Sequence, residues 1–335
     1  MKAVVVSEPG DVRVQDVSEP QVGPKDVLVQ VGACGICGTD IHIIDGEFPP
    51  TRYPIIIGHE FGGTVTAAGD EVIDFKVGDR VGIDPTLNCG ECYFCQRGKG
   101  NLCERWNAVG VGHHPGGFAE YVAVPERCAY HLPDGMSFAE AALIEPVSCV
   151  VHGFHLLAPQ PGDSYLVYGA GPMGLQNAQV ARYYGASHVA IVDINPSRLE
   201  IARSFGFDLV GASIDEVHHA APRGFDVVIE ATGRTKVAEL AINGVIRGGK
   251  LLISGVCPPG ETAAYDAFKI YNDEISIIGS MAVSRSYGPA MSVIKAGALD
   301  TKRMVSHSFP MDRFDEAVAT MRAGVGLKIQ VDPRA

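Results

Sequence analysis

The residues best suited to chemistry in this 335-residue chain are two groups of potential metal ligands. The denser group lies in the stretch CGECYFCQRGKGNLC, which holds the cysteines Cys89, Cys92, Cys95 and Cys103. Four thiolates close a tetrahedral Zn²⁺ site, and CxxC spacing lets two sulfurs bind one ion from a tight turn. The alternatives are a disulfide staple, a zinc ribbon that binds nucleic acid and an iron–sulfur cluster. A zinc ion held by four cysteines has no coordination position open to a substrate, so this group predicts a structural role and not a catalytic one.

The second group is spread over two glycine-flanked loops and a later apolar run. Cys37 opens the stretch CGTDIH, and His59 and Glu60 follow a glycine. Cys, His and Glu are the ligand types of a catalytic Zn²⁺. Asp40 is a candidate for orienting His59 through a hydrogen bond. Glu145 stands in an otherwise apolar run, where a buried carboxylate needs a partner such as a metal or a metal-bound water.

A third motif, GAGPMG, lies between a strand-like run and a helix-like run. In such a GxGxxG turn the glycines allow a tight bend, close approach of a pyrophosphate and close packing of helix on strand. The free N–H groups of the helix then face the phosphates. The candidate dinucleotide contacts in this turn are Gly169, Gly171, Pro172, Met173 and Gly174.

Two further residues bear on which dinucleotide binds. Asp193 ends the next strand, 19 residues after Gly174, where an acid accepts hydrogen bonds from the adenosine ribose. A carboxylate there repels a 2′-phosphate, so the pattern predicts NAD in preference to NADP. Arg198 stacks on the adenine, accommodates the 2′-phosphate of NADP as a less favoured alternative, or is a solvated charge on its helix.

Two regions of the chain with different sequence patterns must position these residues. Up to about residue 133 the chain reads as short strands broken by glycine and proline, which is typical of a β-rich domain. The run 137–157 predicts one or two helices joined at Pro146. From about residue 162 strands alternate with helices, including a helix from about Thr235 to Ile246, and this predicts a doubly wound parallel sheet. The overall class is therefore α/β.

Composition narrows the classes of function. The net charge of −12 argues against a nucleic-acid surface, which needs lysine and arginine. No signal peptide is visible, and no apolar run reaches the ~20 residues needed to cross a membrane. We therefore expect a cytoplasmic protein without membrane or nucleic-acid partners. Thiols stay reduced in that compartment, which favours a metal over a disulfide for the cysteine cluster.

Taken together, the motifs CGTDIH, GHEFGGTV, CGECYFCQRGKGNLC and GAGPMG resemble those of the zinc-dependent medium-chain dehydrogenase/reductase family. The likeness covers essentially the whole chain. It implies a GroES-like catalytic domain over 1–148, with a structural-zinc lobe at 89–103, and a Rossmann NAD-binding domain over 149–285. It further implies that the segment 286–335 returns to the catalytic domain.

The resemblance also implies roles for the second group of ligands. Cys37 and His59 become ligands of a catalytic zinc, and Glu60 and Glu145 are the candidates for its third protein ligand, with Glu60 the better direct ligand. With the zinc of the cysteine lobe this makes two Zn²⁺ per chain. Family members of this kind are commonly homodimers or homotetramers.

A proton relay follows from the same resemblance. Thr39 would take the proton of the substrate hydroxyl and pass it by way of the nicotinamide ribose to His42, which releases it to solvent. The hydride then moves to the nicotinamide. Without the relay, His42 would be an exposed loop histidine.

The substrate is less defined. Classical alcohol dehydrogenases carry Cys where Glu145 stands, and Glu in the context IEPVSCVVHG resembles the polyol (sorbitol-like) and threonine dehydrogenase branch. Sorbitol enzymes carry an Arg-Tyr pair after the last Rossmann strand, which the stretch 279–283 lacks, and an aromatic residue where this chain has Ile43 and Ile44. Other sugar alcohols, sugar phosphates, vicinal diols and L-threonine stay open.

Three residues are candidates for the wall of a substrate pocket or, equally, for scaffold: Phe118, Arg285 and Tyr287. A non-enzymatic alternative is a dehydrogenase fold kept for nucleotide sensing or structure. Loss of Cys37 or His59 would favour that alternative or a zinc-free quinone reductase, and both residues are present. The sequence therefore predicts an enzyme that oxidises a secondary alcohol, with a polyol as the first choice of substrate.

Overall fold

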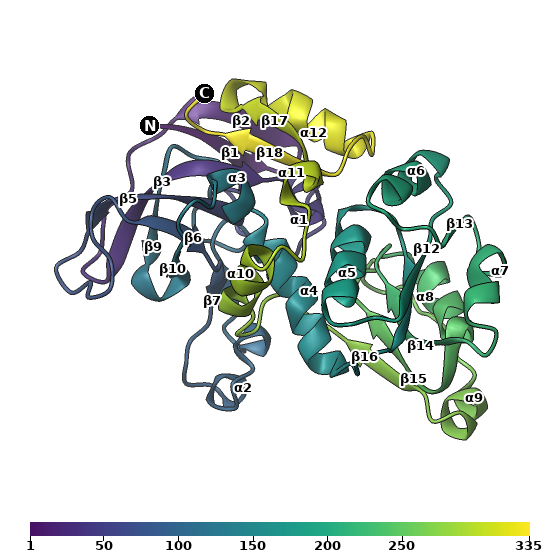
Figure 1. The fold of residues 1–335 in the computed structure, drawn as a ribbon. Coiled ribbons are helices and arrows are strands. Elements are labelled where there is room, and N and C mark those ends of the chain that lie inside the picture. The colour runs from purple at the N-terminus through teal and green to yellow at the C-terminus, as the bar shows by residue number, and fades with distance from the viewer. The chain divides into compact units, whose positions relative to one another are not determined.

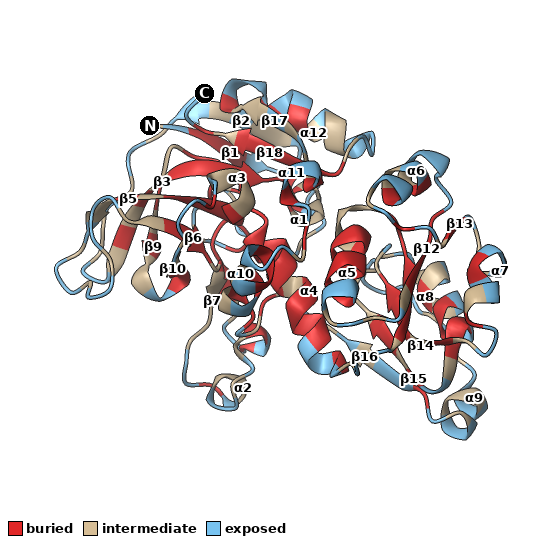
Figure 2. Ribbon diagram, viewed as in Figure 1, coloured by how far each residue is buried: buried red, intermediate tan, exposed pale blue.

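The structure is a computed structural model that describes residues 1–335, and its contacts divide the chain into two units. The first unit comprises Met1–Ser148, Val283–Lys295 and Thr301–Ala335. The second comprises Cys149–Ala282 and Ala296–Asp300. Each unit has its own buried core, visible as the buried strands and helix faces in Figure 2.

A seven-stranded sheet forms the framework of the first unit, in the order β10-β6-β5-β3-β18-β17, with β9 also paired to β3. Buried residues alternate with partly buried ones along β9 and the first half of β3, and the buried side chains of the sheet fill the core. The last strand of the chain, β18, pairs antiparallel with β3, so the C-terminal segment lies beside an N-terminal strand of the same sheet (Figure 1). The strands are β3 (Asp26–Gly35), β5 (Glu60–Ala68), β6 (Arg80–Ile83), β9 (Tyr121–Pro125), β10 (Ala129–His131), β17 (Val305–Pro310) and β18 (Lys328–Asp332).

Smaller elements complete the first unit. Three strands, β1 (Lys2–Glu8), β2 (Asp11–Asp16) and β4 (Ile55–Ile56), form a second sheet, and β7 (Thr86–Leu87) pairs with β8 (Asn107–Ala108). The helices are α1 (Gly38–Ile44), α2 (Tyr93–Gln96), α3 (Phe138–Ala141), α10 (Tyr287–Lys295), α11 (Thr301–Met304) and α12 (Phe314–Arg322), and α4 (Ile144–Leu157) continues into the second unit.

The second unit is built on a six-stranded sheet in the order β13-β12-β11-β14-β15-β16, and every neighbouring pair is parallel. This is the doubly wound arrangement expected from the alternation of strands and helices. Its strands are β11 (Ser164–Tyr168), β12 (His188–Val192), β13 (Val210–Gly211), β14 (Phe225–Glu230), β15 (Val245–Ile253) and β16 (Ser276–Gly279). Its helices are α5 (Pro172–Tyr183), α6 (Pro196–Ser204), α7 (Ile214–Val217), α8 (Thr235–Ala241) and α9 (Ala267–Asn272).

Two local predictions were wrong at element boundaries. The break between helices α3 and α4 falls before Ile144 and not at Pro146, which sits in the first turn of α4. Proline is tolerated there because the first N–H groups of a helix have no partner within it. Helix α8 ends at Ala241 and a short 3₁₀ turn follows, because Val245 already begins β15.

None of the helices combines the length and the apolar character that crossing a bilayer requires. The longest helix with marked apolar character, α4, has 14 residues and carries Glu145 in its first turn. The core of each unit accounts for the apolar runs seen in the sequence.

Candidate active site

Helix α1 positions the first ligand of the mixed-ligand group. Cys37 precedes the helix as its N-cap, and the backbone N–H of Cys37 donates a hydrogen bond of 2.8 Å to Oδ2 of Asp40. The buried Asp40 carboxylate thereby ties the start of the helix to the loop that carries the thiol. The Cys37 side chain is held at the surface of the core, ready to bind a metal as a thiolate.

His59 lies against the same carboxylate. Its Nδ1 is 3.4 Å from Oδ1 of Asp40, and both side chains are buried. Burial lowers the pKa of His59, but the Asp40 carboxylate and the Cys37 side chain outweigh it, so that this pKa lies well above its usual range. The surroundings of His59 thus favour positive charge, as a metal site does. A carboxylate beside one ring nitrogen also leaves the other available for a metal, and the orienting hydrogen bond from His59 to Asp40 stays a prediction.

Glu60 begins strand β5 and points to the same place. The ligand atoms of Cys37, His59 and Glu60 all lie within 4.8 Å of one another. One thiol, one imidazole and one carboxylate make the donor set of a zinc site with an open coordination position. The residues therefore fit the metal that the sequence predicted. Glu145 is buried in α4 but is outside this cluster, so its part in metal binding stays a prediction.

A fourth residue at this site, Lys328, was not predicted from the sequence. Its side chain is buried, and Nζ donates a hydrogen bond of 2.7 Å to Oε1 of Glu60 and one of 3.2 Å to the carbonyl of Ile36. A lysine between apolar residues of a strand, in LKIQVD, was the signal available. A buried lysine is rare unless it is paired.

Thr39 and His42 lie one turn apart on α1. The thiol of Cys37 is 3.8 Å from Oγ1 of Thr39, so the threonine hydroxyl borders the metal cluster. The His42 imidazole is about half exposed, and its Nδ1 is 2.8 Å from Oε2 of Glu47. The helix therefore holds a hydroxyl near the cluster and an imidazole at the solvent side, which is the placement that a proton relay needs.

The cysteine lobe is a separate and closed site. All nine cysteines are free thiols, so the disulfide alternative is wrong. The sulfurs of Cys89 and Cys95 are 3.9 Å apart, as are those of Cys92 and Cys103. A tetrahedron of Zn–S bonds places its sulfurs about 3.8 Å apart, so the four thiols fit a structural zinc. The backbone N–H of Glu91 lowers the pKa of Cys89 to about 6, which favours the thiolate that metal binding requires.

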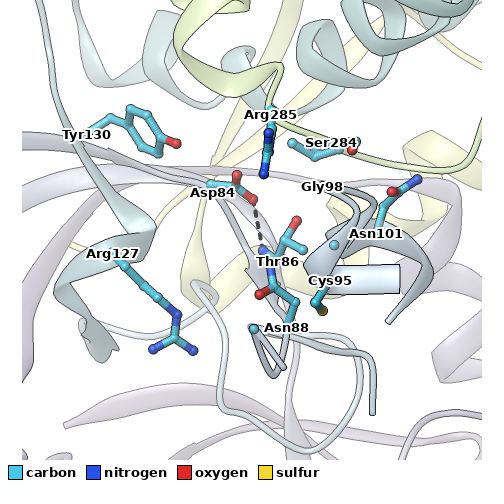
Figure 3. A pocket seen from close by; sticks show the side chains of 13 residues that line it. Asp84, Thr86, Asn88, Cys95, Gly98, Asn101, Arg127, Tyr130, Ser284 and Arg285 are labelled. Atoms are coloured by element: carbon cyan, nitrogen blue, oxygen red, sulfur yellow. Dashed lines mark hydrogen bonds between the residues drawn. The ribbon is translucent and has the colours of Figure 1, made fainter. Parts of the chain in front are cut away.

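A polar pocket of about 370 Å³ lies beside this lobe (Figure 3). Arg285 points into it above Asp84, and a Cβ on Gly98 of the lobe would overlap the Arg285 guanidinium. Asp84 accepts a hydrogen bond of 2.9 Å from the N–H of Thr86. None of Cys37, His59 and Glu60 lines this pocket, so Arg285 belongs to the surroundings of the cysteine lobe.

The remaining candidates for a pocket wall are buried side chains. Phe118 is fully buried in the core of the first unit and packs edge-on against Phe314. Tyr287 is buried against Tyr130. Ile43 and Ile44 are buried in the same core as Phe118.

The glycine turn of the second unit has the predicted form. It connects β11 to α5, with Gly171 as N-cap and Pro172 in the first helical turn. Gly169 has φ +103°, a conformation that favours glycine, and a Cβ on Gly174 would overlap the carbonyl of Gly169. The turn therefore needs glycine at both positions, and the start of α5 presents free N–H groups to a pyrophosphate.

Asp193 lies at the end of β12 beside this turn. Its Oδ2 accepts a hydrogen bond of 2.8 Å from the N–H of Ala170, and its Oδ1 accepts one from Asn195. Nη1 of Arg198 is 3.9 Å from Oδ2 of Asp193. The carboxylate and the guanidinium thus share the place where the adenosine ribose of a dinucleotide binds in such folds.

Comparison with known proteins agrees with both units. Residues 23–134 match the alcohol dehydrogenase GroES-like domain, and residues 172–296 match the zinc-binding dehydrogenase family. The chain is 37% identical over 343 residues to D-arabinitol dehydrogenase 1 of Uromyces fabae, across 99% of this chain and 97% of the relative. It is 35% identical over 349 residues to L-threonine 3-dehydrogenase of Mesorhizobium japonicum, across 99% and 98%.

A solved structure is similar over the same length. The zinc-binding dehydrogenase of Sinorhizobium meliloti 1021, bound to NADP, superposes with a TM-score of 0.94 at 35% identity and covers 99% of each chain. Fold, cysteine lobe, mixed-ligand site and dinucleotide turn all agree with the predicted family. The chain belongs to the zinc-dependent medium-chain dehydrogenase/reductase family, among its NAD(P)-dependent alcohol and polyol dehydrogenases.

Proposed function

We propose that this protein oxidises a secondary hydroxyl group of a sugar alcohol to a ketone, with NAD⁺ as the hydride acceptor. The observation that carries the proposal is the cluster of Cys37, His59 and Glu60, whose ligand atoms lie within 4.8 Å of one another. A zinc ion bound there supplies a Lewis acid that stabilises negative charge on the substrate oxygen. The similarity to a D-arabinitol dehydrogenase supports a polyol as the substrate.

The chain's own residues would handle the proton and the cofactor. Thr39, beside Cys37, would accept the hydroxyl proton as it gives its own proton to the nicotinamide ribose, and His42 on the next turn of α1 would pass that proton to solvent. Glu47 orients the imidazole of His42. The start of α5 binds the pyrophosphate, and Asp193 accepts hydrogen bonds from the ribose hydroxyls. We expect NAD to bind better than NADP because the Asp193 carboxylate repels a 2′-phosphate.

A second candidate substrate is L-threonine. The 35% identity to an L-threonine 3-dehydrogenase supports it, since this reaction also oxidises a secondary alcohol. L-Threonine carries an ammonium group and a carboxylate group that the substrate site must bind, whereas a polyol presents only hydroxyl groups. The two candidates are therefore separable by a direct comparison of kcat/KM. Assembly into homodimers or homotetramers stays a prediction.

The test is NAD⁺ reduction by the purified zinc-loaded protein across four- to six-carbon polyols, vicinal diols, simple alcohols and L-threonine, with NADP⁺ and chelator controls. We expect the highest kcat/KM with a polyol and NAD⁺, and loss of the signal on chelation. A higher kcat/KM with L-threonine would replace the first candidate by the second. A folded protein that binds zinc and NAD but reduces no cofactor with any substrate would contradict both.

A further inference from the structure

The second unit contains a buried carboxylate that no step of the proposed function uses. Glu230 ends β14, and none of its surface is exposed. β14 pairs with β11 on one side and with β15 on the other (Figure 1). The order of strands reverses between β11 and β14, because the chain adds β12 and β13 beyond β11 and then returns to β14. In open parallel sheets a dinucleotide binds across the carboxyl ends of the strands at this reversal.

The turns that follow β14 and β15 are both hydrogen-bonded to Glu230. Its Oε1 accepts hydrogen bonds of 2.7 Å from the N–H of Thr232 and 3.1 Å from the N–H of Gly233, and one from the Thr232 hydroxyl. Its backbone carbonyl accepts bonds of 2.9 Å and 2.8 Å from the N–H groups of Ser254 and Gly255. A Cβ on Gly255 would lie 2.6 Å from Oε2. All the groups bonded to the carboxylate are donors, which suits its ionised form because that form only accepts.

No cation balances the negative charge of Glu230. The donors on its carboxylate are backbone N–H groups and one hydroxyl, and it forms no ion pair with a lysine, arginine or histidine. Arg234, which follows in the chain, is exposed, so water screens its charge. A buried charge is screened much less, so it acts on its surroundings over a longer range. Burial raises the pKa of the Cys257 thiol in the loop after β15, and the charges of Glu230 and Glu261 raise it further.

The two halves of a dinucleotide meet different charges at this edge of the sheet. In the proposed function, Asp193 and the start of α5 bind the adenosine half and the pyrophosphate beside β11 and β12. We therefore expect the half with the nicotinamide on the β14 side, where a Cβ on Gly169 of the glycine turn would lie 3.1 Å from Cγ2 of Thr232. The nicotinamide ring is cationic in NAD⁺ and neutral in NADH. An unbalanced negative charge on this side therefore distinguishes the two forms of the cofactor.

We propose that Glu230 is a specificity-determining residue whose buried charge favours binding of NAD⁺ over NADH. The inference rests on the proposed function, since it takes NAD as the cofactor. Because none of its surface is exposed, Glu230 acts through its electric field and not by contact with the ring. Such a preference suits the oxidation of an alcohol, in which the oxidised cofactor binds first and the reduced cofactor leaves.

The test measures the Kd of the zinc-loaded protein for NAD⁺, NADH and ADP-ribose by calorimetry at one ionic strength. Glu230→Gln removes the charge and keeps a carbonyl oxygen that accepts from Thr232. Two unit charges about 10 Å apart at an effective dielectric constant of about 20 change a binding constant by about tenfold. We expect the ratio of the Kd for NAD⁺ to the Kd for NADH to rise about tenfold in Glu230→Gln. ADP-ribose lacks the ring, so its Kd should stay within about threefold.

Two control variants separate the charge of Glu230 from its hydrogen bonds. Thr232→Val removes one bond to the carboxylate but leaves its charge, so it should change the Kd for NAD⁺ and for NADH by the same factor. Glu230→Asp also keeps the charge, and the ratio of the two Kd values should stay within about threefold of the original. If Glu230→Gln raises the Kd of all three ligands by the same factor, the carboxylate only holds the two turns together and the proposal is overturned.

The same measurements separate this proposal from the proposed function. If the unaltered protein binds neither NAD⁺ nor NADH, the proposed function fails. If it binds both and Glu230→Gln leaves the ratio of the two Kd values unchanged, only the role of Glu230 fails. Should Glu230→Gln fail to fold, Cys257→Lys decides, because it places a cation where the charge of Glu230 acts. Its ratio should rise, that of the uncharged control Cys257→Met should not, and an unchanged ratio in Cys257→Lys contradicts the proposal.

Discussion

The two metal sites of the first unit differ in how the chain builds them. The lobe takes its four thiols from the fifteen residues 89–103, and the sulfurs of Cys89 and Cys103 accept hydrogen bonds from nearby backbone N–H groups. The mixed-ligand site takes Cys37 from a helix cap and Glu60 from the start of a strand, and Lys328 from the other end of the chain. One site is local and chemically uniform, whereas the other is assembled by the tertiary fold.

The donor sets differ in what they leave open. Four thiolates complete a tetrahedron around zinc, so no position is left for a substrate. One thiol, one imidazole and one carboxylate leave a position, and the carboxylate is also bound to an ammonium group. We therefore assign stability to the lobe and chemistry to the mixed-ligand site, and the following predictions test that division.

The largest effect is expected from Cys37→Ser. It removes the thiolate from the mixed-ligand site, so kcat should fall on the order of 1000-fold, because a metal supplies several kcal/mol of charge stabilisation in the transition state. Zinc content should fall by one ion per chain. Activity assays and metal analysis on the same sample check this. Retained activity with one zinc would mean that the lobe, and not Cys37, carries the chemistry.

Cys103→Ser is the reciprocal variant in the lobe. A three-thiol lobe binds zinc poorly, and loss of a structural metal costs folding free energy directly. We expect a loss of roughly 2–3 kcal/mol and a fall in the melting temperature of about 5–10 °C, with kcat per folded molecule within about threefold of the original. Calorimetry and active-site titration measure the two quantities. An unchanged melting temperature would contradict a structural role for the lobe.

Asp40→Asn sharpens the comparison within the mixed-ligand site. The amide keeps the shape but loses the charge next to His59, whose Nδ1 is 3.4 Å from Asp40. Zinc affinity of this site should weaken by about 10- to 100-fold while the lobe is unaffected. Competition with a chromophoric chelator measures both affinities. If the affinity stays the same, Asp40 only caps helix α1.

The smallest effect is expected from His42→Gln. The imidazole is exposed and paired with Glu47, so water can replace part of its function. We expect a roughly tenfold lower kcat below neutral pH and recovery at high pH, where solvent accepts the proton directly. The dependence of kcat on pH, measured for His42→Gln and for the unaltered protein, checks this prediction. Parallel profiles would remove His42 from the proton path.

Much of this architecture could be predicted from local sequence. The cysteine lobe and the GAGPMG turn are contiguous, so spacing alone specified their geometry, and the turn needs glycine at Gly169 and Gly174 as expected. Asp193 lies beside the glycine turn, as its position at the end of the second strand of this unit predicted. Periodicity also predicted five of the six parallel strands of the second unit, because each of the five is a short, apolar run, whereas the two-residue strand β13 was not predicted.

Other features depend on tertiary packing. The pair between Glu60 and Lys328 joins residues far apart in the chain and arises from the register of β18 on β3. Arg285 was a candidate for the wall of the substrate pocket or for scaffold, and the fold places it beside the structural lobe. The helix predicted to end at Ile246 ends earlier because β15 begins at Val245, which belongs to the sheet.

The most direct test follows zinc content, polyol-dependent NAD⁺ reduction and thermal stability together while a chelator removes metal. We predict that activity disappears as the first of two zinc ions leaves, from the site of Cys37, His59 and Glu60, while the melting temperature holds until the second leaves. Re-addition of zinc should restore activity. Activity that survives loss of the first ion, or that falls only together with the melting temperature, would contradict the division of labour between the two sites.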